Sequence, residues 1–520
     1  MVMEANGKVY PETYGEALAI HARERGGQPA LRFADRVTTY AEYDDHATRI
    51  ANGLAARGIG KGDRIAYLGK NSDHAVELTL GAARAGVVFV PIIWRLAPAE
   101  IEFILGDCGA KALFVEEAFV EAADAGGWQG ARIVMEREFA DWRDAQSSAP
   151  VETVVERDDA HLQLYTSGTT GKPKGVVLSH YNGTNLRPRL EANDIYWYAA
   201  QPGDAAILAM PYGHIAGVGT ATGAVLGGVD LIIHAEFDPV ATIRDVERYR
   251  VKWIFLVPAA IGLLLAHPAA ENADFSSVEG LTYGASPIPL ELLKQGVARL
   301  KCEFAQLYGL TETYGTVVSL PPEDHREGRE HVMRSAGKPL PGVELQIRDA
   351  EGKALPAGET GEVAIRSDCV MLGYWNRPEE NAKALTGDGW FLTGDAGMLD
   401  DEGYLFIQDR IKDMIISGGE NVYPAEVESA IYGHPAIADI AVIGVPDDKW
   451  GEAVKAVVVV KPGEELTEEQ LIAHAKTQIA GFKCPKSVDF IAALPRNPSG
   501  KILRRELRAP YWEGRERQVN

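Results

Sequence analysis

The sequence predicts an α/β fold, with a large N-terminal domain of layered α/β subdomains and a small α+β domain at the C-terminus. Three observations support this prediction. Strand-like and helix-like patterns alternate over the first four hundred residues, the pattern changes near residue 400, and a chain of 520 residues is too long for one ordinary core. Hydrophobic residues make up 46% of the chain and charged residues 24%, which is the balance of a folded rather than a disordered protein.

The N-terminal part contains repeated βαβ patterns. Thr39 and Glu42 form a capping box that predicts the start of a helix, and Gly58 can end it. Strands and helices then alternate, as layers of parallel sheet and helix require. In chain order, we expect a strand over 65–68, a helix over 73–85 and a strand over 87–90. A helix over 101–105 and a strand over 112–115 follow. Further along, we expect a strand over 253–257 and then a helix that ends near His267.

One long apolar stretch needs a separate interpretation. Residues 205–229 contain no Asp, Glu, Lys or Arg and are numerous enough to cross a bilayer. Pro211, His214 and several glycines interrupt the stretch, however, which is atypical of a membrane helix. We therefore expect a buried strand and helix here and no transmembrane segment.

Composition excludes several classes of function. The formal net charge of -22 argues against a nucleic-acid surface as the main partner. The four cysteines are far apart in the sequence, so neither a disulfide framework nor a zinc site is indicated. The first fifteen residues lack the apolar core of a secretory signal. Together these features predict a cytoplasmic protein.

The pattern after residue 400 is that of a compact α+β unit. Residues 398–399 and 404–407 flank an acidic turn and predict a hairpin. Short strands are expected within 440–445 and 456–460. Two helices accompany them. Pro424 is expected to be the first residue of one helix, and Thr467 is expected to be the N-cap of the other.

The segment from Tyr165 to Val176 is the strongest functional signal. It places hydroxyl residues, glycines and two lysines in a loop between apolar segments, a combination suited to holding phosphate. It differs from the phosphate loop of nucleotide hydrolases, because Lys172 is followed by Pro173 rather than by Ser or Thr. The alternative interpretation is a solvent-exposed Gly/Thr turn.

Further motifs along the chain make a family resemblance clear. Besides 165–176, they are Tyr308–Thr313, Thr393–Asp395, Asp409–Asn421 and Asn497–Lys501. In their order and spacing, over nearly the whole chain, the sequence resembles the adenylate-forming superfamily, especially bacterial fatty-acid and other carboxylic-acid CoA ligases. The resemblance implies that a carboxylate and ATP give acyl-AMP and pyrophosphate, and that CoA then displaces AMP. ATP and CoA would be co-substrates and Mg²⁺ the cofactor.

The resemblance also assigns roles at the nucleotide site. The β- and γ-phosphates would be held by Thr166, Ser167, Gly168, Thr169, Thr170, Gly171 and Lys174. Glu312 would bind Mg²⁺, and Thr311 would contact the α-phosphate. The adenine pocket would consist of Gly284, Ala285, Ser286, Gln306, Leu307 and Tyr308, and the ribose contacts would be Asp395 and Arg410. Taken singly, Glu312 also fits an ordinary surface acid, Asp395 fits a turn residue, and Arg410 fits one member of a surface ion pair.

The second half-reaction is expected to involve the small domain. The resemblance implies an N-terminal adenylation domain over 1–408, a hinge at 409–412 with Lys412 as the pivot, and a mobile domain over 413–520. Lys501 would be the adenylation lysine. The expected CoA contacts are Gly418, Gly419, Trp450, Phe482, Lys483 and Lys486. Some relatives have arginine at the position of Cys484. Trp450 and Phe482 fit the core of a domain as well as a CoA site.

The acid pocket is expected around an aromatic–histidine gate. The matching positions are Tyr212, Gly213, His214, Ala216, Thr220, Gly309 and Tyr314. Relatives usually have a bulky aromatic where this chain has Gly213, which suggests a wider pocket, whereas Tyr314 suggests a narrower one. His214 by itself also fits a core histidine. The expected substrate is a medium- or long-chain fatty acid or a bulky aryl or alicyclic acid.

Two other functions are alternatives to the CoA ligase. One is an adenylating enzyme that loads a carrier protein, and the other is a noncatalytic acyl-adenylate sensor. Lys174, Glu312, Asp395 and Lys501 are all present, which favours an enzyme over a sensor. A homodimer stays an open alternative.

Overall fold

The N-terminal part of the protein is organised around a seven-stranded sheet. The computed structural model describes residues 3–5, 8–166, 173–196, 200–418, 420–496 and 501–513. In spatial order the strands of this sheet are β20 (Gly373–Tyr374), β10 (Lys174–Ser179), β9 (Ala160–Thr166), β6 (Val88–Ile93), β5 (Arg64–Gly69), β7 (Ala110–Val115) and β8 (Ala131–Val134). The central strands read as continuous apolar runs because helices cover both of their faces.

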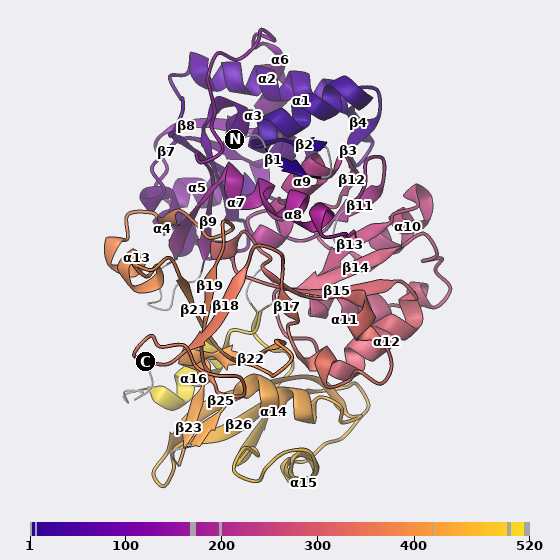
Figure 1. Cartoon of the computed structure of the whole chain (residues 1–520), viewed down its shortest axis with the longest axis vertical. Helices are drawn as coiled ribbons and strands as arrows, with labels where there is room; N and C mark the ends of the chain where they lie inside the picture. The colour runs from indigo at the N-terminus through magenta and orange to yellow at the C-terminus, as the bar shows by residue number, and fades with distance from the viewer. Residues whose placement is uncertain are drawn as a thin grey trace.

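A nine-stranded sheet lies beside the first (Figure 1). Its strands in spatial order are β17 (Lys338–Pro339), β16 (Val318–Leu320), β15 (Glu303–Tyr308), β14 (Gly280–Gly284), β13 (Trp253–Leu256), β11 (Ala205–Leu208), β12 (Asp230–Ile233), β3 (Pro29–Phe33) and β4 (Arg36–Thr39). Strands β11 to β15 and β3 pair in parallel, and the pairs with β4, β16 and β17 are antiparallel. The carboxyl ends of β14 and β15 therefore meet at one edge of the sheet.

The helices that pack against the two sheets bury the largest core. This core joins α1 (Tyr14–Arg25), α2 (Tyr40–Ala56), α3 (Asp73–Ala85) and α9 (Ile215–Gly227) to strands of both sheets. A Cβ on Gly81 of α3 would lie 2.3 Å from the side chain of Ile50 on α2, so a glycine is needed for this close helix contact. The remaining helices of this part are α4 (Pro98–Asp107), α5 (Val120–Ala125), α6 (Ala140–Asp144), α7 (His180–Thr184), α8 (Leu186–Ala192), α10 (Pro239–Tyr249), α11 (Pro258–Ala266), α12 (Leu290–Leu300) and α13 (Pro378–Ala384).

Three smaller sheets complete the described chain, and the first is the antiparallel pair of β1 (Met3–Ala5) and β2 (Lys8–Tyr10). An antiparallel sheet is formed by β18 (Glu344–Arg348), β19 (Gly361–Arg366), β21 (Phe391–Leu399) and β22 (Leu405–Arg410). The last sheet is formed by β23 (Ile415–Ser417), β24 (Glu420–Val422), β25 (Ile437–Asp447), β26 (Gly451–Val460) and β27 (Ser487–Phe490). With α14 (Pro424–Ile431) and α15 (Glu468–Gln478) it has a core of its own, and α16 (Arg504–Trp512) follows. Figure 1 shows this unit at the opposite end of the molecule from α1 and α2.

The predicted elements are confirmed where the structure describes them. The capping box at Thr39 begins α2, and α3 has the predicted bounds. The expected hairpin after residue 398 is β21–β22, Pro424 is the first residue of α14, and Thr467 caps α15. The apolar stretch forms β11 and α9, as expected. Among the described residues, none of the helices is long and apolar enough to cross a membrane.

Candidate active site

A large cavity gathers residues from distant parts of the chain. Its volume is about 2930 Å³, whereas a pocket for one small ligand measures roughly 300–1,000 Å³. There is room for a nucleotide and a second substrate together. The predicted nucleotide-site residues that line it are Thr166, Lys174, Ala285, Ser286, Gln306, Leu307, Tyr308, Thr311, Glu312 and Asp395, and Lys501 lines it too. Ser167, Gly168, Thr169, Thr170 and Gly171 lie outside the described residues.

One end of the cavity combines a cation with a buried carboxylate. Thr166 ends β9 and Lys174 begins β10, and the two residues face each other in the antiparallel register. The ammonium of Lys174 lies 5.0 Å from the centre of the Tyr374 ring. The Tyr374 hydroxyl donates to Oε1 of Glu312 at 2.9 Å, and Glu312 is 8% exposed. Because β20 pairs with β10, Tyr374 links Lys174 to Glu312.

The carboxyl ends of β14 and β15 form the neighbouring wall. A Cβ on Gly284 would lie 2.3 Å from the carbonyl oxygen of Leu307, so the two strand ends meet only with glycine at this position. Gly284 itself lies behind the cavity wall, which begins at Ala285 in the left-handed conformation (φ 67°). The Tyr308 hydroxyl donates to Oδ2 of Asp395 at 2.8 Å. This bond joins β15 to β21 across the cavity.

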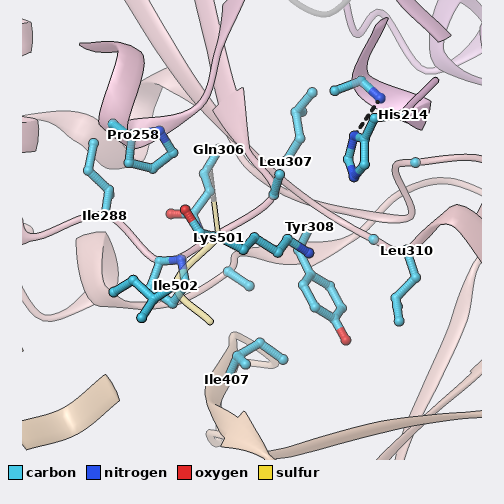
Figure 2. Close-up of a pocket in the computed structure, with 18 of the residues that line it drawn as sticks. His214, Pro258, Ile288, Gln306, Leu307, Tyr308, Leu310, Ile407, Lys501 and Ile502 are labelled. Carbon is cyan, nitrogen blue, oxygen red and sulfur yellow. Dashed lines mark hydrogen bonds between the residues drawn. The ribbon is translucent and has the colours of Figure 1, made fainter. Parts of the chain in front are cut away.

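Lys501 approaches the same cavity from the C-terminal part of the chain. Figure 2 shows its side chain extending into the cavity beside Tyr308. His214 is the N-cap of α9, where its Nδ1 accepts a hydrogen bond from the backbone N–H of Ala216 at 3.2 Å. Burial and then the charge of Lys501 lower the pKa of His214 to about 3. His214 is therefore neutral at neutral pH and offers no charge to an acid.

Part of the predicted acid pocket lines this cavity and part does not. His214, Ala216, Thr220, Gly309 and Tyr314 are in its wall. Tyr212 instead lies in the core, 1% exposed, with its hydroxyl 2.8 Å from that of Thr79. The expectation that Gly213 widens the pocket is wrong, because a Cβ there would lie 2.7 Å from the backbone nitrogen of Ile93. The glycine lets the chain pack tightly against β6, which a side chain would prevent.

The aromatic residues expected at the CoA site lie on the surface of the small unit. Trp450 is 41% exposed and Phe482 is 42% exposed, so neither belongs to its core. Gly418 has a φ of 65°, and its N–H donates to the Trp450 carbonyl at 2.8 Å. A Cβ on Gly418 would lie 2.6 Å from the indole ring, which therefore covers this turn.

The other residues of this surface are polar or buried. Lys483 contacts both carboxylate oxygens of Glu426, at 2.6 and 2.8 Å. Lys486 donates to the carbonyl of Gly481 at 3.1 Å. The Cys484 side chain is only 1% exposed and packs in the core of the small unit, which explains why an apolar residue suits this position. Gly419 lies outside the described residues.

A buried ion cluster connects the expected hinge to the small unit. Arg410 ends β22 and Lys412 belongs to a short 3₁₀ turn at 411–413. Arg504 lies 2.7 Å from the Glu428 carboxylate and 3.6 Å from that of Asp409. Asp409 also accepts from the N–H of Ala425 at 3.1 Å. The cluster therefore holds the start of α16, three residues after Lys501, against β22.

Replacement of Arg504 by methionine is expected to reduce the free energy of unfolding by about 3 kcal/mol, because it removes a cation that lies between two largely buried carboxylates. Urea unfolding followed by tryptophan fluorescence measures the change. Arg505→Met is a matched control, since Arg505 is the exposed neighbour on the same helix, and its effect should stay within about 0.5 kcal/mol. Equal effects of the two substitutions would show that the cluster contributes no stability.

The structure adds residues that no sequence motif marked. Tyr374 belongs to a two-residue strand, which is too short to show periodicity. At the acid-pocket side, Tyr14 donates from its hydroxyl to that of Tyr314 at 2.7 Å, and the Tyr314 hydroxyl lies 3.2 Å from Nε2 of His161. The ring of His161 stacks on that of His180, with centres 4.7 Å apart. These residues are brought together only by the tertiary fold.

The two stacked histidines predict a pH-dependent stability. Burial lowers the pKa of His180 to about 3 and that of His161 well below its ordinary value, and the neighbouring His180 adds to the second shift. Below pH of about 6.5 the unfolded chain takes up protons that the folded protein does not, so stability falls as pH falls toward 3. Each histidine should contribute about 1.4 kcal/mol of loss between pH 7.5 and 5.5.

The measurement compares urea unfolding of the wild type and His180→Gln at these two pH values. The variant should lose about 1.4 kcal/mol less than the wild type over this interval, whatever its stability at pH 7.5. His331→Gln, at an exposed position, serves as the control. Identical losses in the wild type and His180→Gln would contradict the assignment of a neutral buried His180.

Comparison with known proteins identifies the family. Residues 18–375 match the model of the AMP-binding enzymes, and residues 426–501 match the model of their C-terminal domain. The chain is 41% identical to a fatty acid–acyl-carrier-protein ligase of Streptomyces coeruleorubidus, over 98% of both chains. It is also 41% identical to a feruloyl-CoA synthase of an Amycolatopsis species, over 93% of this chain and 96% of the relative.

A solved structure has the same architecture. The o-succinylbenzoate CoA synthetase of Bacillus subtilis, in complex with its acyl-adenylate intermediate, superposes with a TM-score of 0.85 at 32% identity, covering 94% of this chain and 97% of that one. The chain therefore belongs to the AMP-binding, adenylate-forming enzymes. Within that family it has activity of the acyl-CoA ligase type, as an ATP-using, AMP-forming acid–thiol ligase.

Proposed function

We propose that this ligase joins a medium- or long-chain fatty acid, or a bulky aryl or alicyclic acid, to CoA. The first step would form acyl-AMP and pyrophosphate, and CoA would displace AMP in the second. The observation that carries this proposal is the position of Lys501. Its side chain lines the same cavity as Lys174, Glu312 and the Tyr308–Asp395 pair, although it comes from the other end of the chain.

The phosphate end of the cavity suits a triphosphate. Lys174 would neutralise the β- and γ-phosphates together with Thr166 and the adjoining loop, because phosphates are bound by cations and N–H donors. Thr311 would contact the α-phosphate. Glu312 is a hard oxygen donor held in place by Tyr374, which fits Mg²⁺, an ion usually bound by one or two carboxylates plus substrate phosphates. Mg²⁺ held there would supply positive charge to the phosphate oxygens.

The nucleoside would bind along the ends of β14 and β15. The adenine pocket would be Gly284, Ala285, Ser286, Gln306, Leu307 and Tyr308, with the base against the Tyr308 ring. Asp395 would accept hydrogen bonds from the ribose hydroxyls, and the hydrogen bond that it accepts from Tyr308 would hold it in position. Arg410 would be a second ribose contact. A carboxylate acceptor at 5% exposure binds a hydroxyl donor more strongly than one in water.

Lys501 would act where charge develops in the first step. The acid's carboxylate oxygen attacks the α-phosphorus, the bond to the β-phosphate breaks, and pyrophosphate leaves with the electron pair. The Lys501 ammonium would donate to the carboxylate and α-phosphate oxygens and so lower the repulsion between the two anions. His214, neutral and hydrogen-bonded to the start of α9, would position the acid without competing for its charge.

The second step would use a different face of the small domain. Rotation about Lys412, between a domain over 1–408 and one over 413–520, would withdraw Lys501 and bring Gly418 and Gly419 toward the acyl-AMP. The CoA thiol would then attack the acyl carbon, and AMP would leave. The exposed aromatic rings of Trp450 and Phe482 suit stacking on the CoA nucleotide. Lys483 and Lys486 would meet its phosphates.

The test is a reaction with a mixed panel of carboxylic acids. The protein is incubated with ATP, Mg²⁺, CoA and the panel, and thioesters are identified by mass spectrometry while pyrophosphate release is measured. An acyl-CoA product together with AMP is expected. Absence of pyrophosphate release with every acid of the panel would overturn the proposed function.

A second candidate acceptor is a carrier protein. It is favoured by the similarity to the acyl-carrier-protein ligase, which spans almost the whole of both chains. Trp450 and Phe482 at the surface favour CoA instead. The same panel with a pantetheinylated carrier protein in place of CoA separates the two acceptors. Formation of acylated carrier protein without formation of acyl-CoA would show that the acceptor is a carrier protein and not CoA.

A further inference from the structure

A hydrogen-bonded group of polar side chains lies on the acid-pocket wall of the cavity. Tyr14 from α1, Thr222 from α9 and Tyr314 all line the cavity. The Tyr14 and Tyr314 hydroxyls are 2.7 Å apart, and the Thr222 hydroxyl is 3.4 Å from that of Tyr314. Most other residues that α9 presents to the cavity are small or apolar. They are Ile215, Ala216, Gly219, Thr220, Gly223, Ala224 and Leu226.

The fold makes space for this group by restricting two backbone positions, Gly183 and Tyr314. A Cβ on Gly183 would lie 2.0 Å from the Tyr14 hydroxyl and 2.5 Å from the Tyr314 ring. Tyr314 itself has a φ of 53°, in the left-handed region that a bulky residue rarely adopts. Two independent backbone features therefore bring the two phenol groups together at the cavity wall.

The hydrogen-bond chain can be oriented in either direction. Tyr14 donates to the Tyr314 hydroxyl, and with the His161 proton on Nδ1 the Tyr314 hydroxyl can donate to Nε2 of His161. Nδ1 of His161 is buried and has no hydrogen-bond partner in the described part of the chain, so no contact of Nδ1 fixes the tautomer of this ring. With the proton on Nε2, the chain reverses, and the Tyr14 hydroxyl becomes able to donate. The group can thus accept a hydrogen bond or donate one.

The position of the group along α9 limits the shape of the acid. Thr222 follows His214 by eight residues, which is about 12 Å along a helix. His214 and Lys501 mark the end where the carboxylate of the acid would lie, if the proposed function holds. A ring with a short side arm spans most of this distance and would place its remote end near Tyr314.

We infer that Tyr14 and Tyr314, with the buried His161 behind them as a positioning residue, form a subsite for an oxygen at the remote end of the acid. The substrate class is a ring-bearing carboxylic acid, aryl or alicyclic, with a hydroxyl or oxo group opposite its carboxylate. A reversible hydrogen-bond chain accommodates both groups, because it accepts from a hydroxyl and donates to an oxo oxygen. This inference rests on the proposed function and specifies its substrate.

The test uses phenylpropanoic acid and its para-hydroxy derivative as a matched pair. For each acid, kcat/KM is measured from pyrophosphate release. The wild type should prefer the hydroxylated acid by about tenfold or more, since a site built to bond a hydroxyl discriminates against an analogue that lacks it. Tyr314→Phe, which removes only the oxygen, should reduce this ratio to within about threefold. A ratio between two acids in one variant is independent of any general loss of activity.

Tyr14→Phe provides a second test if Tyr314→Phe folds poorly, and it should reduce the ratio in the same direction. Equal use of the two acids by the wild type would overturn the subsite, as would an unchanged ratio in both variants. Turnover of fatty acids with neither aryl acid accepted would overturn it too, but would leave the ligase proposal intact. No pyrophosphate from any acid would instead reject the proposed function.

Discussion

Replacing Lys501 with alanine should slow adenylation by roughly a hundredfold or more, which is the usual loss when one preorganised donor to a transition state is removed. The lysine lines the cavity and its charge helps to lower the pKa of His214, so the ammonium acts within the site rather than in bulk solvent. The second half-reaction should persist, because acyl-AMP no longer needs this cation. Pyrophosphate release and conversion of synthetic acyl-AMP to thioester measure the two steps separately.

The control for this variant is Lys476→Ala, on the exposed face of α15. It removes one positive charge from the same domain and should leave both half-reactions at the wild-type rate. If Lys501→Ala reduced both steps equally, the lysine would have a general structural role and its assignment to adenylation would be wrong.

Proline at position 412 should have the opposite effect, sparing adenylation and slowing thioester formation by about a hundredfold. Lys412 lies in a 3₁₀ turn, whose backbone φ is close to the value that proline imposes. The arrangement with Lys501 in the cavity is therefore compatible with proline. The proposed rotation of the small domain about Lys412 would require φ to change at this residue, and the pyrrolidine ring would prevent the change.

Lys412→Ala is the matched control, since alanine keeps φ free and should permit both half-reactions. The two steps are measured as for Lys501. An unaffected second step in Lys412→Pro would place the pivot elsewhere. Together, Lys501→Ala and Lys412→Pro should show reciprocal losses, because one removes a group of the first conformation and the other prevents access to the second.

Local patterns predicted the elements well, and the reason is physical. The Thr39–Glu42 capping box satisfies backbone donors at a helix start, and this depends on residues only three positions apart. The continuous apolar strands at β5 and β6 and the acidic turn before β22 are likewise local signals. Periodicity and capping therefore located these elements without any knowledge of their neighbours.

Contacts between distant segments were not predictable in the same way. Gly213 looked like an opening in the acid pocket, but the strand end at Ile93 fills the space that a side chain would have occupied. Tyr212 looked like part of the gate and is a core residue. Trp450 and Phe482 fitted a core and a surface equally, and only the folded domain shows that both are exposed.

The sequence by itself determined the type of protein. Its glycine- and hydroxyl-rich segment and its alternating elements depend on residues that are close in the chain. The resemblance of its motifs, in their order, to those of the adenylate-forming superfamily placed it among these ligases. Tertiary structure decided which groups meet in the cavity. Tyr374 joins Lys174 to Glu312, and Tyr14 reaches Tyr314 across three hundred residues, because sheet pairing and helix packing set these distances and no local pattern encodes them.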